Sequence, residues 1–366
     1  MINVFGSKVG KEELTQVTES ISNQWMGMGP KTKEFEKRMA ERLKADKFIL
    51  VDSGSNGLYL ALTLLNLPAG SEVIVPSFTW VSCAQAVMLA GCVPVFCDVD
   101  IDSQNVTADL IKPHITDKTS AIMVVHYGGL AVEMDPILEL GYPIIEDACH
   151  AVDSIYKGKA CGTIGDVGVY SFDAVKNLSM GEGGGVVSNR KEAMERADVL
   201  RYCGIGKSGF EASTHGKERW WEYNIVEPFI KMNPSDIAAG IGLAQLSKLD
   251  ELQQYRKEIW NIYQQEFKNI DWIKCPCEAN DKDKHSYFTY FIRVPERDKL
   301  AKYLFEKGIY TTLRYHPLHL NPLYKSNSVL PNCCELNETG INIPLHPSLS
   351  MNDVDKIVEE IKDYKN

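Results

Sequence analysis

The sequence predicts an α/β protein with one large, mainly parallel sheet of seven strands and a smaller α+β domain after it. Short runs of apolar, often β-branched residues recur between residues 48 and 188, and helix-length stretches separate most of them. The runs are continuously apolar, which indicates strands that are covered on both faces. The last two are so close together that a bend or a reversal of the parallel pattern is expected there. The runs occupy residues 48–51, 73–75, 93–96, 121–125, 143–145, 167–170 and 185–187.

Segments outside these runs have the pattern of helices. Phe35, Met39 and Leu43 recur at four-residue spacing, which is the spacing of one helix face. A second helix is expected over residues 57–65. A long one is expected from about residue 234 to 267, with Asn233 as the capping residue before a first-turn proline.

The rest of the chain mixes strand and helix patterns. Residues 287–294 alternate as a strand, residues 298–307 form a helix that Gly308 ends, and residues 352–362 form a terminal helix capped by Asn352. A chain of 366 residues is long enough for two cores. We therefore expect a large α/β domain over residues 1–245 and a small α+β domain over residues 246–366.

Charge and composition exclude several classes of protein. The formal net charge is -10, and such a protein repels nucleic-acid backbones and anionic lipid headgroups. No segment reaches the roughly 18 uninterrupted apolar residues of a membrane span. The N-terminus lacks a basic stretch followed by an apolar run. We expect a cytoplasmic protein with no nucleic-acid and no membrane partner.

The cysteines are not spaced as metal ligands. Ten are scattered along the chain, several within apolar stretches where a free thiol packs as a small hydrophobic group. Cys275 and Cys277 flank a proline, and Cys333 and Cys334 are adjacent. Neither pair has the two-residue spacing typical of zinc ligands or redox dithiols. We expect reduced thiols and no metal site.

The most informative segment surrounds Lys176. This lysine stands between an expected strand and a glycine-rich turn at residues 181–185. Missing side chains at such a turn let a flat cofactor approach the backbone. A lysine placed this way can form a Schiff base once desolvation or a neighbouring cation lowers its pKa. Taken alone, it is more often a surface lysine before a turn; the surrounding motifs reverse that interpretation.

Three further motifs follow other expected strands. Asp147 lies at the sheet edge where ligands of α/β proteins bind, and a carboxylate there keeps a pyridinium ring protonated; capping the next helix is the alternative. Residues 52–57 open a helix, whose N-terminus suits a phosphate. Residues 52–57 match neither the dinucleotide-binding pattern nor the Walker pattern. This mismatch favours a small phosphorylated cofactor. Trp80 follows a neighbouring strand. Its side chain is expected either to stack on a flat ring or to pack in the core.

Taken in order, these motifs resemble those of the DegT/DnrJ/EryC1/StrS family of sugar aminotransferases, which use pyridoxal 5'-phosphate and have the type I aminotransferase fold. The resemblance covers nearly the whole chain, and the order and spacing of the motifs together are highly specific. Some members carry histidine in place of the Schiff-base lysine and act as dehydratases, and Lys176 argues against that branch. The matching segments are residues 25–30, 35–36, 52–57, Trp80, 146–147, 171–185, 244–246, 315–319 and 343–347.

The resemblance implies roles at the cofactor ring. Lys176 carries the Schiff base and moves a proton between the amino donor and the cofactor. Asp147 pairs with the pyridine nitrogen, Trp80 stacks on the ring, and His150 lies near the phenolic oxygen. The kinetics are expected to be ping-pong.

The resemblance also implies a phosphate site and a shared active site. Ser55, Asn56 and Ser171 hold the cofactor phosphate. Family members are homodimers whose active sites borrow a loop from the partner, which here is residues 229–236. Many relatives read Asn-Tyr-Arg in this loop, whereas this chain reads Lys-Met-Asn, so Asn233 is the expected phosphate contact.

The activity implied by the resemblance is transfer of an amino group from L-glutamate to the keto group of a nucleotide-linked keto-deoxy sugar, for polysaccharide biosynthesis. A small phosphorylated ketone or a cyclitol ketone is the alternative acceptor. A non-catalytic regulator with the same fold is disfavoured, because such a protein is expected to lose Lys176 or Asp147. The choice of sugar depends on loops such as residues 204–221, whose conformation does not follow from the sequence.

Overall fold

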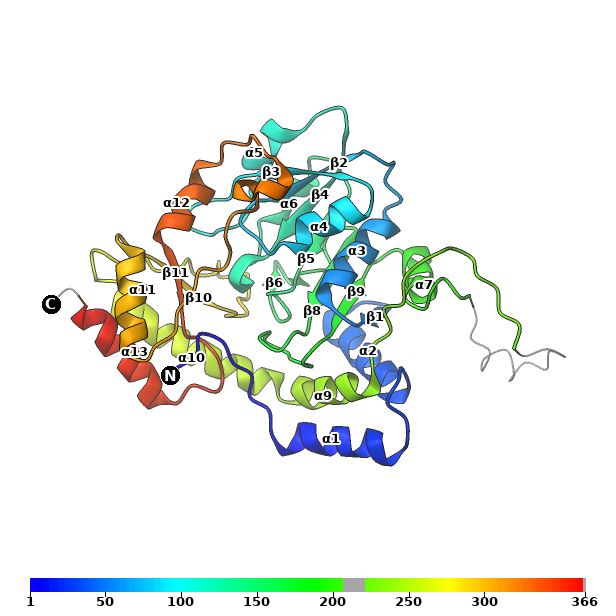
Figure 1. Cartoon of the computed structure of the whole chain (residues 1–366), viewed down its shortest axis with the longest axis horizontal. Helices are drawn as coiled ribbons and strands as arrows, with labels where there is room; N and C mark the ends of the chain where they lie inside the picture. Colours follow the sequence, from blue (N-terminus) through cyan, green and yellow to red (C-terminus); the bar gives the residue numbers. More distant parts are fainter. Residues whose placement is uncertain (207–220, 365–366) are drawn as a thin grey trace.

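The predicted seven-stranded sheet is present in the computed structural model, which describes residues 1–206 and 221–364 (Figure 1). Its strand order is β1-β9-β8-β5-β4-β2-β3. The strands are β1 (Phe48–Val51), β2 (Glu72–Pro76), β3 (Val93–Cys97), β4 (Thr119–Val125), β5 (Ile144–Asp147), β8 (Val167–Ser171) and β9 (Gly184–Val187).

One strand runs against the others. β2, β3, β4, β5 and β8 pair in parallel, whereas β9 is antiparallel to both β8 and β1. The reversal expected at the last two runs is therefore confirmed. Since β1 and β8 are each antiparallel to β9, they run in the same direction. The carboxyl ends of all strands except β9 thus lie at one edge of the sheet.

Helices cover both faces of the sheet, which explains the continuous apolar runs. In β1, Ile49 and Val51 join the core on one face, whereas Phe48 and Leu50 join the core on the other. Full burial of one such side chain contributes roughly 1.5–3 kcal/mol. The first face is covered by α3 (Gly54–Leu64), α4 (Ser82–Leu89) and α7 (Lys191–Leu200), and the second by α2 (Pro30–Leu43), α5 (Ala108–Ile111), α6 (Met134–Leu138) and α9 (Asp236–Ser247).

A second, smaller core lies in the C-terminal part of the chain. The N-terminus packs onto this part, because the Ile2 N–H donates to the Gly308 carbonyl at 2.7 Å. The domain division at residues 245 and 246 stays a prediction, and it falls inside α9. The C-terminal elements are α10 (Leu249–Phe267), β10 (Tyr290–Arg293), α11 (Arg297–Glu306), α12 (Pro331–Thr339), β11 (Gly340–Ile343) and α13 (Met351–Asp363), with β10 antiparallel to β11.

Short elements complete the described chain. They include a two-stranded hairpin and several turns of 3-10 helix between the larger elements. Of the loop predicted to set sugar specificity, residues 207–220 lie outside the described residues. Where the chain is described, no helix is long and apolar enough to cross a membrane. These elements are α1 (Lys11–Ser22), η1 (Lys112–His114), η2 (Tyr127–Gly129), β6 (Ile155–Tyr156), β7 (Lys159–Ala160), η3 (Leu318–Leu320) and η4 (Pro322–Tyr324).

Several predicted helix boundaries are wrong. The helix expected over residues 234–267 is two helices, α9 and α10, which meet at Lys248. The Ser247 hydroxyl donates to the Ala244 carbonyl at 2.7 Å, and such a bond disturbs the regular helix ladder. Ser235, not Asn233, caps α9, and Ser350, two residues before the expected Asn352, caps α13. α3 begins three residues earlier than expected, at Gly54.

Candidate active site

The predicted site residues gather at the carboxyl edge of the sheet. Asp147 is the last residue of β5, and His150 follows it by three residues. Ser171 is the last residue of β8, and Lys176 lies in the loop from β8 to β9. Ser55 lies in the first turn of α3, which follows β1. This is the edge at which ligands bind in open α/β sheets.

The N-terminus of α3 has the features of an anion site. Its capping residue, Ser53, accepts a hydrogen bond from the Asn56 N–H at 3.2 Å, and the Asn56 side chain donates to Asp52 at 2.7 Å. The Ser55 hydroxyl lies 2.7 Å from that of Ser82 on α4. Backbone N–H groups in the first helical turn have no carbonyl partner within the helix and carry its positive dipole. This end of α3 therefore suits a phosphate.

Two glycines allow the elements around this site to close. A Cβ on Gly54 would lie 2.8 Å from the Ser171 Cβ, and one on Gly184 would lie 2.3 Å from the Ser53 carbonyl carbon. Side chains at either glycine would force these backbones apart. The glycines thus bring the N-terminus of α3 against the end of β8 and the start of β9.

Asp147 is a buried carboxylate held on both oxygens. The backbone N–H of Cys149 donates to Oδ1 at 3.0 Å, and the thiol of Cys83 on α4 donates to Oδ2 at 3.1 Å. Burial, and then the negative charge of Asp147, raise the pKa of Cys83 well above its usual range, so this thiol remains a donor. Thr79 Oγ1 lies 3.3 Å from the same sulfur.

Lys176 is held in a desolvated position beside an aromatic ring. Its backbone N–H donates to the Asp173 carbonyl at 2.9 Å, and its Nζ lies 4.9 Å from the centroid of the Phe288 ring. Burial lowers the pKa of Lys176, and the positive charge of Arg314 acts in the same direction. A lowered pKa favours the neutral amine, which is the nucleophilic and proton-accepting form.

His150 and Trp80 join residues from the C-terminal part of the chain. The His150 ring stacks on Phe288 at 4.2 Å between centroids, and its Nε2 lies 3.1 Å from the Tyr315 hydroxyl. Burial, followed by the charges of Lys176 and Arg314, lowers the pKa of His150 well below its usual range. Trp80 is 51% exposed, so the core alternative is wrong, and its ring lies 5.4 Å from Tyr315.

Behind Asp147, a buried hydrogen-bonded pair anchors the neighbouring loop. His126 Nε2 lies 3.0 Å from Glu146 Oε2, and both side chains are fully buried. Because the Val132 N–H donates to His126 Nδ1 at 3.0 Å, Nδ1 carries no proton, and the ring donates to Glu146 through Nε2. Glu146 also accepts backbone hydrogen bonds from Gly162, Ile164 and Gly165.

Asn233 lies at the rim of this region. The carbonyl of its neighbour Met232 accepts the Asp52 N–H at 3.1 Å, which places the segment beside the end of β1. The Asn233 Oδ1 is buried and has no hydrogen-bond partner in the structure. Among the described residues, no hydrogen bond joins Asn233 to the predicted phosphate residues, so its role stays a prediction.

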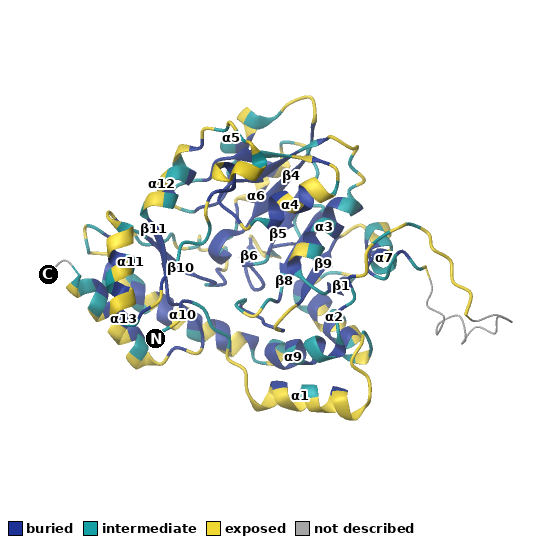
Figure 2. Cartoon of the chain, viewed as in Figure 1, coloured by how far each residue is buried: buried dark blue, intermediate teal, exposed yellow. Residues whose placement is uncertain are grey.

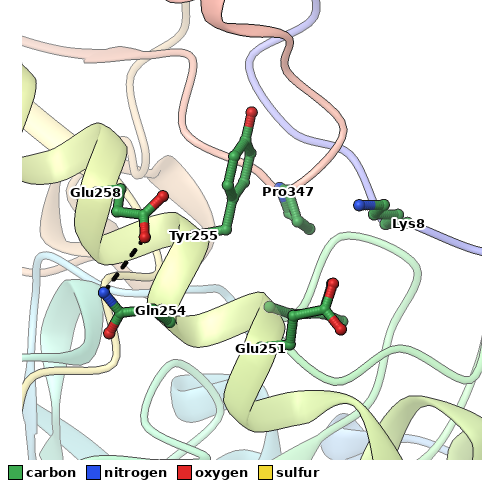
Figure 3. Close-up of a pocket in the computed structure, with 7 residues that line it drawn as sticks. Lys8, Glu251, Gln254, Tyr255, Glu258 and Pro347 are labelled. Atoms are coloured by element: carbon green, nitrogen blue, oxygen red, sulfur yellow. Dashed lines mark hydrogen bonds between the residues drawn. The ribbon is translucent and has the colours of Figure 1, made fainter.

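A surface groove of about 180 Å³ contains none of these residues (Figure 3). Lys8 and Glu251 line it together with Tyr255 and Glu258 of α10. The Lys8 Nζ lies 6.0 Å from the Tyr255 ring centroid. The residues that line the groove do not combine a desolvated lysine with a buried carboxylate, as Lys176 and Asp147 do at the sheet edge.

Sequence reasoning missed Cys83, Phe288 and Arg314. Cys83 sits in an apolar stretch and gave no sign that its thiol meets Asp147. Phe288 and Arg314 reach the site from the C-terminal part, and only the motif that begins at Tyr315 pointed to that region. In the described parts of the chain, no group of three or more His, Cys, Asp or Glu side chains is placed to hold a metal ion.

Solved structures of other proteins superpose on this chain over nearly its whole length. The aminotransferase TlmJ from Streptoalloteichus hindustanus superposes with a TM-score of 0.93 at 38% identity, covering 99% of this chain and 98% of that one. The PMP form of Spr1654 from Streptococcus pneumoniae gives a TM-score of 0.93 at 30% identity, with the same coverage. Spr1654 is also solved in a PLP form, with a TM-score of 0.90 at 29% identity, covering 98% of this chain and 97% of that one.

Comparison of sequences finds relatives over nearly the whole chain. The dTDP-4-dehydro-2,3,6-trideoxy-D-glucose 4-aminotransferase of Saccharopolyspora spinosa is 36% identical over 371 residues, which cover 99% of this chain and 96% of that protein. The family model described as the DegT/DnrJ/EryC1/StrS aminotransferase family matches residues 7–362. With the fold and the site geometry, these matches show that the chain is an enzyme of type I aminotransferase fold and belongs to the DegT/DnrJ/EryC1/StrS aminotransferase family.

Proposed function

We propose that this enzyme uses pyridoxal 5'-phosphate to move an amino group from L-glutamate to the keto carbon of a nucleotide-linked keto-deoxy sugar. The observation that carries the proposal is Lys176, a desolvated lysine of lowered pKa at the edge where Asp147 and the N-terminus of α3 also lie. The relative from Saccharopolyspora spinosa carries a dTDP-linked keto sugar in its name, which supports the class of acceptor.

The residues at the sheet edge fit the cofactor. The N-terminus of α3, with Ser55, Asn56 and the adjoining Ser171, would hold the phosphate. Exposed Trp80 is free to stack on a ring. Asp147, which two hydrogen bonds orient, would face the ring nitrogen.

Each protein group has a chemical task in the proposed reaction. When bound, pyridoxal phosphate supplies an aldehyde for the amino group and a ring that accepts electrons as a carbon loses its proton. Lys176 anchors the cofactor and then, as a neutral amine, moves the proton between the amino donor and the cofactor. Asp147 holds a fixed negative charge beside the ring nitrogen. His150 stays neutral and contributes hydrogen bonding near the phenolic oxygen.

We further propose a homodimer in which residues 229–236 complete the partner's phosphate site through Asn233. α1 and the segment just after it are largely exposed (Figure 2). Several of their exposed residues have large apolar side chains, and exposed apolar surface is typical of an interface. The exposed side chains include Leu14 at 65%, Ile21 at 51%, Trp25 at 57% and Met26 at 57%. The ten unpaired cysteines support a reducing, cytoplasmic location.

A substrate screen tests the activity. The purified protein is incubated with L-glutamate and a panel of keto-sugar nucleotides, keto-phosphates and cyclitol ketones, and release of 2-oxoglutarate is measured. Turnover is expected with a sugar nucleotide. Turnover confined to a keto-phosphate or cyclitol ketone would overturn the acceptor class, and a colourless protein that takes up no pyridoxal phosphate would overturn the whole proposal.

A complementation experiment tests the shared site. Inactive Lys176→Ala chains are mixed with Asn233→Ala chains, after both are verified as folded, dimeric and able to exchange subunits. A heterodimer then contains one site built only from intact segments, so part of the activity should return. If Asn233→Ala is defective and verified heterodimers recover nothing, Asn233 acts within its own chain.

A further inference from the structure

Arg314 holds its charged group among aromatic rings beside the proposed site. The guanidinium carbon lies 3.6 Å from the centroid of the Phe5 ring and 5.1 Å from that of Phe288. It also lies 5.5 Å from the centroid of the adjacent Tyr315 ring. The Arg314 backbone N–H donates to the Asn342 side chain at 2.9 Å, which fixes the start of the side chain. A guanidinium that packs on aromatic rings can still donate hydrogen bonds from its N–H groups to a ligand.

This guanidinium has no anionic partner. Within residues 1–206 and 221–364, it makes no ion pair and donates no hydrogen bond, although the rings around it partly remove it from water. An unpaired, partly desolvated charge is unfavourable unless a ligand supplies the opposite charge. The other half-buried arginines of the described residues each have a carboxylate partner, namely Arg42, Arg196, Arg293 and Arg297.

Arg314 also shares a ring with the proposed reactive lysine. The Lys176 Nζ lies 4.9 Å from the Phe288 centroid and the Arg314 guanidinium carbon 5.1 Å from it. His150 stacks on the same ring at 4.2 Å. The Arg314 charge is close enough to lower the pKa values of both Lys176 and His150, after the larger effect of burial. Lys176 and Arg314 therefore border the same ring and lie close enough to interact electrostatically.

We propose that Arg314 binds a carboxylate of the amino donor. This inference rests on the proposed function, in which an amino acid delivers its nitrogen at Lys176. An amino acid carries a carboxylate on the carbon next to that nitrogen, and the planar fork of a guanidinium matches a carboxylate with two parallel hydrogen bonds.

The surroundings favour a carboxylate over the diphosphate of a sugar nucleotide. A diphosphate carries more than one negative charge and is usually held by several cations or by the N–H groups of a helix N-terminus. The rings of Phe5, Phe288 and Tyr315 supply no further cation, and the nearby Lys176 is committed to the cofactor in the proposed function. One guanidinium balances one carboxylate.

The test separates the donor half-reaction from the acceptor half-reaction. Arg314→Gln and Arg314→Lys are prepared as holoenzymes, with Arg38→Gln as the control. Arg38 loses the same charge on α2, where its side chain is 47% exposed and pairs only with Glu34. Thermal unfolding and uptake of pyridoxal phosphate establish that each variant is folded and loaded.

The half-reaction with L-glutamate is followed by the change in cofactor absorbance. Arg314→Gln should lower kcat/KM for this step about 100-fold, mainly through KM, because a charged two-point contact is lost. Arg314→Lys should recover part of it, since an ammonium keeps the charge but not the fork. Arg38→Gln should react as the wild type, and the acceptor half-reaction should keep its KM in every variant.

Binding of a ligand that cannot react tests the role of Arg314 separately from catalysis. Glutarate, which has carboxylates but no amino group, is titrated into each holoenzyme by calorimetry, and its affinity should fall in Arg314→Gln but not in Arg38→Gln. Unchanged glutarate affinity and donor kinetics in Arg314→Gln would overturn the inference, as would a defect confined to the sugar nucleotide. A wild-type enzyme that reacts with no amino acid would overturn the proposed function instead, while the glutarate titration would still decide the role of Arg314.

Discussion

Cys83→Ala should weaken cofactor binding although Cys83 is not expected to touch the cofactor. Its thiol donates to Asp147 Oδ2 at 3.1 Å, and Asp147 keeps only the backbone donor of Cys149 when that thiol is removed. A hydrogen bond to a charged group contributes about 1.5–3 kcal/mol. If the whole of this free energy is lost from cofactor binding, the affinity for pyridoxal phosphate falls about 10- to 150-fold.

The same substitution also removes a buried sulfur, which costs about 1 kcal/mol of stability through lost packing. Cys97→Ala is the matched control, because Cys97 is equally buried, at 0% exposure, and makes no contact with Asp147. Both variants should lose similar free energy of unfolding in urea. Only Cys83→Ala should lose cofactor affinity in an absorbance titration of the cofactor-free protein, and Cys83→Ser should restore part of it. Equal affinity in the two alanine variants would show that the thiol does not position Asp147.

Lys176→Ala should fold and lose transamination by several orders of magnitude in the coupled assay, since it removes both anchor and proton carrier; near-normal turnover would place the Schiff base elsewhere. Because the folded-state pKa of Lys176 is lowered, the unfolded state binds more protons between that value and the ordinary one of 10.5. The wild-type apoprotein should therefore gain stability relative to Lys176→Ala as pH rises through this window, and a constant difference in urea midpoints would contradict the lowered pKa. Asp147→Asn should reduce both cofactor affinity and proton abstraction, and a change in thermal stability alone would leave Asp147 a local structural residue. Glu146→Gln should cost about 3–5 kcal/mol in urea unfolding, because it removes a buried carboxylate that accepts hydrogen bonds from His126 and three backbone N–H groups, and it turns an amide toward those donors; a loss under 1 kcal/mol would refute that account.

Local sequence pattern predicted the sheet and the positions of Asp147 and Lys176 at its edge. Each strand is a continuous apolar run because helices cover both of its faces, so the pattern did not depend on distant contacts. Asp147 and Lys176 were found for the same reason, since they follow strands whose ends must meet at one edge.

Contacts between distant segments could not be predicted in this way. Arg314 matters because Phe5 and Phe288 arrive from elsewhere in the chain to surround it. The break at Lys248 has no glycine or proline to announce it; it coincides with the Ser247 back-bond and with an ion pair from Lys248 to Glu13 at 2.6 Å. Such features depend on tertiary partners rather than on local propensity.

The antiparallel strand β9 affects the order in which the strands of the sheet pair during folding. β1 enters the sheet only through β9, as Phe48 pairs with Val187 and Val51 with Gly184. A nascent chain that has emerged only as far as β8 therefore lacks the strand with which β1 pairs in the native sheet. Pairing over such a sequence separation closes a long loop and is slow. The docking of β1 fixes the N-terminus of α3 and the Lys176 loop in one step, so the phosphate site and the lysine should become protected together in pulsed hydrogen exchange during refolding.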